Sequence, residues 1–131
     1  MKTASSPKAT ITQLSPKKFA RMKQPPLLID VRSEMEYATG HAPNARNLSL
    51  QRLMLSGISP LRRRVLPQWF RELPKDQPIA VICLTSHRSP IAARQLVQAG
   101  FTKVFNISGG MMEWSRLRLE NRTGKPSPAP Q

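Results

Sequence analysis

The sequence predicts an α/β fold in which a central parallel sheet of about five strands is flanked by helices, in three layers. Two apolar runs, residues 27–31 and 79–82, have the length and composition of strands that are covered on both faces of a parallel sheet. Helix signals alternate with such runs along the chain, as crossover connections require. With 131 residues and 39% hydrophobic content, the chain is large enough to bury the core of one such domain.

The predicted elements alternate along the chain, with one uncertain stretch. Residues 51–78 contain apolar residues interrupted by glycine and prolines, so we expect broken helix there, beside the rim where the strands end. Strands are expected at residues 10–13, 27–31, 46–50, 79–82 and 103–107, and helices at 16–22, 34–38, 90–99 and 111–120.

Capping residues mark the helix starts. Ser15 and Ser89 are expected to be N-caps because a proline follows each of them at the first helical position. Ser33 is expected to cap the helix at 34–38, with Glu36 completing a capping box. Glycines that end a helix or form a turn are Gly40, Gly100, Gly109 and Gly110.

The chain is strongly basic, with 21 lysines and arginines against 7 acidic residues and a net charge of +14. Such a charge attracts small sulfur oxyanions, phosphates, nucleic acid or acidic proteins. The densest basic run is residues 62–64, all arginine. We interpret the basic residues as a solvated surface, because nucleic-acid binders usually add exposed aromatic residues. Aromatic residues make up only 5% here, and we expect Trp69, Phe70 and Trp114 in the core.

The ends of the chain differ in composition from its middle. We expect a flexible basic N-terminus at residues 1–8, one domain at 9–120 and a flexible proline-rich tail at 121–131. No apolar stretch approaches the ~20 residues of a membrane helix, so no membrane insertion is expected. The N-terminus lacks the apolar segment of a secretory signal, and the only cysteine cannot form an internal disulfide. We therefore expect a cytoplasmic, reducing location.

The only cysteine, Cys83, directly follows the predicted strand at 79–82. Asp30 and Arg32 lie at the end of another predicted strand, and ligands of parallel sheets bind at the carboxyl ends of the strands. The three residues are therefore expected on one rim. A lone cysteine is either buried as a small apolar residue or reactive through its thiolate.

The segment after Cys83 favours the reactive alternative. A short loop between a buried strand and a helix start directs backbone N–H groups and the positive helix end at the sulfur, and Arg88 adds a full charge. Four residues separate Cys83 from Arg88, one fewer than in a Cys-x5-Arg phosphatase loop. This smaller loop has room for one extra sulfur atom rather than a phosphoryl group. The loop residues are Leu84, Thr85, Ser86, His87 and Arg88.

At this point the sequence resembles the rhodanese family of sulfurtransferases. The resemblance extends over roughly residues 10–120 and implies a rhodanese-like three-layer sandwich. The landmarks occur in the family's order, and each of them alone is a weak signal. They are Asp30-Val31-Arg32, Glu36-Tyr37, the stretch from Gly40 to Ala45, the strand into Cys83, the stretch from Ala99 to Val104, and Gly109-Gly110 with Trp114.

The resemblance implies a double-displacement reaction. Cys83 would be the nucleophile that takes sulfane sulfur from thiosulfate or a persulfide donor and passes it to a thiol or cyanide, with residues 84–88 as its cradle. No metal and no organic cofactor are implied. Leu84 stands where many active members have a basic residue, and Ser86 where glycine is common, which lowers the expected activity on thiosulfate.

Two other functions stay open at this stage. The domain could be a binding or sulfur-relay module that docks a protein or RNA through its basic surface, although nucleic acid is not favoured as a partner. Phosphatase or arsenate-reductase chemistry also uses a cradled thiolate and ranks last because of the loop length. Asp30 and Arg32 are expected to support the rim structurally, and His41 to be a packing residue.

Overall fold

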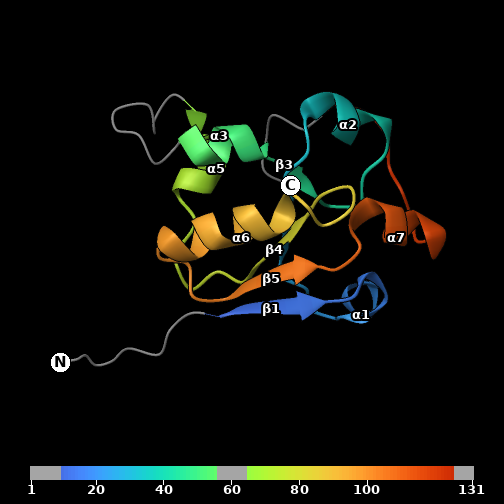
Figure 1. Ribbon diagram of the computed structural model, residues 1–131, viewed down its shortest axis with the longest axis horizontal. Helices are drawn as coiled ribbons and strands as arrows, with labels where there is room; N and C mark the ends of the chain where they lie inside the picture. The colour runs from blue at the N-terminus through green and yellow to red at the C-terminus, as the bar shows by residue number, and fades with distance from the viewer. Residues whose placement is uncertain (1–9, 56–64, 126–131) are drawn as a thin grey trace.

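A computed structural model describes residues 10–55 and 65–125, so the arginine run at 62–64 lies outside the described residues. Its sheet has five parallel strands in the order β1-β5-β4-β2-β3 (Figure 1). The strands are β1 (Ile11–Leu14), β2 (Leu27–Asp30), β3 (Arg46–Asn47), β4 (Ile79–Ile82) and β5 (Val104–Ile107). The helices are α1 (Pro16–Arg21), α2 (Glu34–Thr39), α3 (Leu50–Leu55), α5 (Gln68–Arg71), α6 (Ser89–Gln98) and α7 (Gly110–Arg116). The predicted α/β class and parallel sheet are confirmed.

Two predicted boundaries were wrong by more than one residue. β3 ends at Asn47 instead of residue 50, because the chain there turns into α3 while Leu50 N still donates a hydrogen bond to Val31 O. α7 ends at Arg116 instead of residue 120, because Arg118 adopts a left-handed backbone conformation with φ of 58° that a helix cannot continue through.

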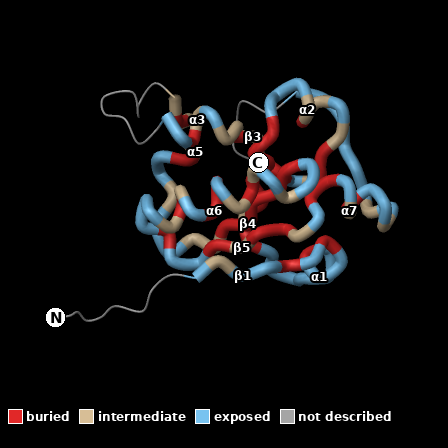
Figure 2. Tube along the Cα trace, in the orientation of Figure 1, coloured by how far each residue is buried: buried red, intermediate tan, exposed pale blue. Residues whose placement is uncertain are grey.

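The core lies on both faces of the sheet, which gives the predicted three layers. β4 is buried along its whole length, at the centre of the molecule (Figure 2). Its Ile79 and Val81 side chains join a cluster with residues of α3, α5 and α6, whereas Ala80 and Ile82 join a second cluster with residues of α1, α2 and α7. Alternate side chains of a strand point to opposite faces, so each face packs against its own set of helices.

Of the aromatic residues that we expected in the core, Phe70 and Trp114 are buried. Trp69 is half-buried and packs against the core, so it lies at the edge of the core. The Arg46 guanidinium covers the Trp69 ring, with its central carbon 4.4 Å from the ring centroid. Within the described residues, no helix has the length and apolarity that crossing a membrane would take.

The start of α7 lies directly against the chain that leaves β4. Met111 N donates to Cys83 O at 2.7 Å, and Met112 N donates to Leu84 O at 3.0 Å. Gly110 has a φ of 60°, and a Cβ atom at this position would lie only 2.4 Å from Cys83 O. Glycine is therefore required here, both for its backbone conformation and for the close approach of two main chains.

We expect Gly110→Ala to lower the free energy of unfolding by about 3 kcal/mol, because strain at positive φ adds to a backbone clash that no side chain can relieve. Gly124→Ala is the matched control: its φ is 116°, but a Cβ atom would meet nothing within 4 Å. It should cost only about 1 kcal/mol. Urea unfolding of both variants measures the difference, and equal losses would show that the contact with the Cys83 chain is unimportant.

Candidate functional site

Cys83 directly follows β4 and is fully buried. Its sulfur accepts hydrogen bonds from Ser86 N at 3.0 Å and from Ser89 N at 3.3 Å, and the Ser89 hydroxyl oxygen lies 3.3 Å away. The loop therefore curls around the sulfur, as the sequence predicted. Backbone N–H groups that converge on one atom favour a negative charge there.

Two opposing effects set the acidity of this thiol. Burial raises the pKa of Cys83, since it removes the charged form from water. Hydrogen bonds from the Ser89 hydroxyl and from the backbone N–H groups of Ser89, Arg88 and Ser86 outweigh burial, so the pKa lies below that of an ordinary thiol. The thiolate is the nucleophilic form of cysteine, and this environment increases its population at neutral pH.

Ser86 makes the tight turn of the loop, with a left-handed φ of 69°. Left-handed backbone is unusual for a residue other than glycine. The expectation that the Ser86 side chain lies in a tight turn is therefore confirmed. Its hydroxyl donates to Ile107 O at 3.2 Å, which ties the turn to the end of β5.

Ser89 does not cap α6, and that prediction was wrong. Ser89 is the first residue of α6, and the N-cap is Arg88, whose carbonyl oxygen accepts a hydrogen bond from Ala92 N at 3.1 Å. The buried Ser89 hydroxyl contacts the Cys83 sulfur instead of a helix amide. The physical reason is that the helix starts one residue earlier, which brings both Ser89 polar groups to the sulfur.

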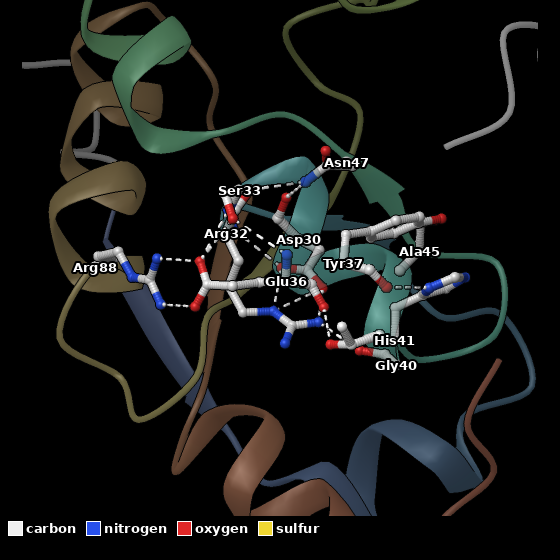
Figure 3. Close-up of polar contacts among 11 residues, drawn as sticks. Asp30, Arg32, Ser33, Glu36, Tyr37, Gly40, His41, Ala45, Asn47 and Arg88 are labelled. Atoms are coloured by element: carbon white, nitrogen blue, oxygen red, sulfur yellow. Dashed lines mark hydrogen bonds and ion pairs between the residues drawn. The ribbon is translucent and has the colours of Figure 1, made fainter. Parts of the chain in front are cut away.

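The Arg88 guanidinium forms two hydrogen bonds with the Glu36 carboxylate, at 2.7 and 2.9 Å (Figure 3). The Arg88 hydrogen bonds hold the pKa of Glu36 at about 2, against 4.5 for an ordinary glutamate. Glu36 also accepts from Ser33 N, which completes the predicted capping box of α2. Arg88 therefore fastens α2 to the end of the loop, and much of its charge is balanced by Glu36.

Asp30 and Arg32 form a buried ion pair on the turn that follows β2. Arg32 Nη2 lies 2.7 Å from Asp30 Oδ2, and the same nitrogen donates to Gly40 O at 2.6 Å. Asn47 Nδ2 donates to the carbonyl oxygens of Asp30 and Arg32, at 3.0 and 2.8 Å (Figure 3). All of these contacts are internal to the rim, which is the geometry of a structural support.

The outer part of the loop is open to solvent. Leu84 is 39% exposed, and Thr85 and His87 are also exposed. Thr85 Oγ1 lies 2.7 Å from His87 Nδ1, so these two polar side chains pair with each other. Beside Arg88 is a cavity of about 220 Å³ that the start of α3 also lines, which agrees with the broken helix expected next to this rim.

His41 is a packing residue, as expected. It is buried, its ring stacks on Tyr37 with centroids 3.6 Å apart, and its Nδ1 lies 2.7 Å from Tyr37 O. Among residues 10–55 and 65–125, no group of histidine, cysteine, aspartate or glutamate side chains could hold a metal ion.

Sequence reasoning overlooked how two residues act at this site. Glu36 was assigned only to a capping box, yet it also pairs with Arg88 across 52 positions of sequence. Ser89 was assigned to a helix cap, yet its hydroxyl and N–H both face the sulfur. The signal for Ser89 was its position directly after the Cys-x4-Arg segment, whereas nothing local to Glu36 indicates its partner.

Comparisons with known proteins agree with this architecture. A family model described as a rhodanese-like domain matches residues 15–117. A sulfurtransferase of Allochromatium vinosum is 32% identical over 93 residues, which cover 71% of this chain and 75% of the relative. The thiosulfate sulfurtransferase GlpE of Vibrio cholerae is 30% identical over 92 residues, which cover 70% of this chain and 74% of the relative.

Solved structures show the same fold. The crystal structure of a rhodanese-related protein from Thermoplasma volcanium matches with a TM-score of 0.66 at 22% identity, over 85% of this chain and 97% of that chain. The family model and the two sulfurtransferases confirm the resemblance that was inferred from the loop and the surrounding motifs, and the solved structure confirms the expected fold.

We expect Glu36→Gln to lower the free energy of unfolding at pH 7 by about 1 kcal/mol, because it removes the charge of a pair that is about one-third exposed. Glutamine at this position can still complete a capping box. The folded-state pKa of Glu36 is lowered, so this stabilisation is present above pH ~4.5 and is lost as the pH falls towards 2. The difference in unfolding free energy between variant and parent should therefore be clearly smaller at pH 2.5 than at pH 7, and a difference of equal size at both pH values would contradict the assignment.

We expect Ser89→Ala to raise the pKa of Cys83, because the variant lacks a hydroxyl that donates to the thiolate. The pKa is measured from the thiolate absorbance at 240 nm, with Cys83→Ser as the blank. This method needs no reagent that would have to reach the buried sulfur. Thr85→Ala is the matched control, since its hydroxyl contacts His87. A shift of equal size in both variants would refute a specific role for the Ser89 hydroxyl.

Proposed function

This chain belongs to the rhodanese-like domain family, and from that membership and the geometry around Cys83 we propose that it is a sulfurtransferase which carries sulfane sulfur as a Cys83 persulfide. The observation that carries the proposal is the set of hydrogen bonds from Ser86 N and Ser89 N to the sulfur. These bonds lower the pKa of the thiol, and the length of the Cys-x4-Arg loop is what we expect for a cradle that accepts one further sulfur atom.

The proposed reaction has two displacement steps. In the first, the Cys83 thiolate attacks the outer sulfur of a donor, the donor S–S bond breaks, and the donor leaves with the bonding electron pair as sulfite or as a thiolate. Cys83 then carries one extra sulfur with a negative charge, which the loop N–H groups stabilise. In the second, a thiolate or cyanide attacks this outer sulfur, the persulfide S–S bond breaks, and the Cys83 thiolate is restored.

The structure favours a persulfide donor over thiosulfate. Thiosulfate is a dianion, and a basic residue at position 84 would help to bind it, but Leu84 is apolar and exposed. Arg88 supplies little free charge because Glu36 pairs with it at 2.7 Å. A persulfide donor carries less negative charge than thiosulfate. It therefore depends less on a cation at position 84 and tolerates an apolar residue there. We also propose a cytoplasmic location, because a single thiol remains reduced there.

We expect incubation with a low-molecular-weight persulfide to add one sulfur atom to the protein, as measured by intact mass spectrometry. Cys83→Ser should show no addition, and a thiol acceptor should remove the added sulfur. No adduct from either a persulfide or thiosulfate would refute the proposal. Turnover of an aryl phosphate that depends on Cys83 would favour phosphatase chemistry instead.

The donor preference is tested in the same experiment with Leu84→Arg. A cation at this position should increase the rate of thiosulfate loading about fivefold, since one charge–charge interaction near the surface contributes about 1 kcal/mol. The rate of loading from a low-molecular-weight persulfide, which carries less negative charge than thiosulfate, should increase less. An equal increase for both donors would show that Leu84 does not determine the preference.

A further inference from the structure

A second concave site lies at the β3 edge of the sheet, away from the cysteine loop. It is a cavity of about 570 Å³ between the end of α2, β3, α5 and the segment that follows α7. This volume lies within the range of small-molecule sites. None of its lining residues belongs to the loop at 83–89. In Figure 3, Arg88 and His41, which lines the cavity, lie on opposite sides of the Asp30–Arg32 pair.

The cavity is positively charged. Arg46, Arg122 and Lys125 line it, and no lining residue is acidic. Arg122 pairs with Glu120 at 2.7 Å, but Arg46 and Lys125 have no carboxylate partner within the described residues. Arg46 is also partly buried, which lowers its pKa because the charged form loses water. A desolvated cation without a counter-ion is a favourable position for an anion.

The walls of the cavity are aromatic and held in place. Trp69 lies under the Arg46 guanidinium, and Tyr37 stacks on His41 with their rings 5° from parallel. Tyr37 Oη donates to Ala45 O at 2.6 Å. His41 and Arg122 exchange two backbone hydrogen bonds, of 2.9 and 2.8 Å, which fix the segment after α7 against the end of α2. The aromatic wall of the cavity is therefore preorganised, whereas the Arg122 and Lys125 side chains are exposed.

The cationic and aromatic side chains of the cavity together indicate the class of ligand. Phosphates favour arginine and lysine side chains, and nucleobases stack on aromatic rings and on guanidinium planes. We propose that this cavity binds a nucleotide, with its phosphate at Arg46, Arg122 and Lys125 and its base against the stack of Arg46 and Trp69. The shared chemistry is the nucleotide unit, either free or within an RNA strand.

The test compares two double variants that each remove two positive charges. Arg46→Ala/Lys125→Ala alters the cavity, whereas Lys17→Ala/Lys18→Ala alters α1, beside β1 at the opposite edge of the sheet. Isothermal titration calorimetry with AMP should show affinity about tenfold lower for the first variant and unchanged for the second. Equal losses would overturn the proposal, because they would show only a general effect of the basic surface. Thermal unfolding establishes that each variant is folded.

The nature of the ligand is tested with further probes. Trp69→Leu should weaken the binding of AMP but not of inorganic phosphate, and AMP binding no tighter than inorganic phosphate would exclude base recognition. If a short oligoadenylate binds and AMP does not, and if this binding also depends on Arg46 and Lys125, the nucleotide unit is recognised as part of an RNA strand. Binding of neither probe, or binding of a glutamate-rich peptide alone, would overturn the proposal. Persulfide loading of Cys83 should be unchanged in the cavity variants. Failure of the nucleotide proposal can therefore be distinguished from failure of the sulfurtransferase proposal.

Discussion

The hydrogen bonds that backbone N–H groups donate to the buried sulfur of Cys83 are the interaction on which the site depends. Burial alone would make this thiol a poor nucleophile, and only the donors from the loop and the first turn of α6 reverse its effect on the pKa. The geometry of those donors in turn constrains the backbone: Ser86 must adopt a left-handed conformation, and α6 must begin at Ser89. The loop is also held in place by α7, whose first backbone N–H groups donate hydrogen bonds to the carbonyl oxygens of Cys83 and Leu84.

Charge is distributed unevenly between this site and the rest of the molecule. The chain carries a net charge of +14, yet Arg88 in the loop and Arg32 on the same rim are each paired with a carboxylate. Asp30 and Glu36 therefore balance the positive charge of the arginines at the cysteine loop, although the protein as a whole is strongly basic. A long-range positive field still attracts anions to the molecule, but the local contacts near the sulfur do not select for high negative charge. By contrast, two cations of the cavity beside β3, Arg46 and Lys125, have no carboxylate partner in the part of the chain that the structure describes, so the two sites differ in their free charge.

Much of the fold could be predicted because its signals are local. The apolar runs of β2 and β4 and the capping box of Ser33 and Glu36 each lie within a few residues of sequence, and the structure contains all three. The order of landmarks around the Cys-x4-Arg loop was likewise enough to indicate the family from the amino-acid sequence. The partners of Glu36 and Ser89 could not be predicted, because both depend on how distant elements pack and on the register with which α6 begins. The end of α7 was misplaced because Arg118, a residue with no special preference for positive φ, terminates the helix.

The first and last strands of the sheet are neighbours, and this has a consequence for biosynthesis. β1 pairs with β5 along four residues, and α7, which supports the cysteine loop, follows β5 in the chain. A nascent polypeptide that has left the ribosome only as far as α6 cannot yet close its sheet or support the loop. The hydrogen bonds that Met111 N and Met112 N donate to the carbonyl oxygens of Cys83 and Leu84 are then still missing. The loop that lowers the pKa of Cys83 is therefore held in place only after β5 and α7 have also left the ribosome.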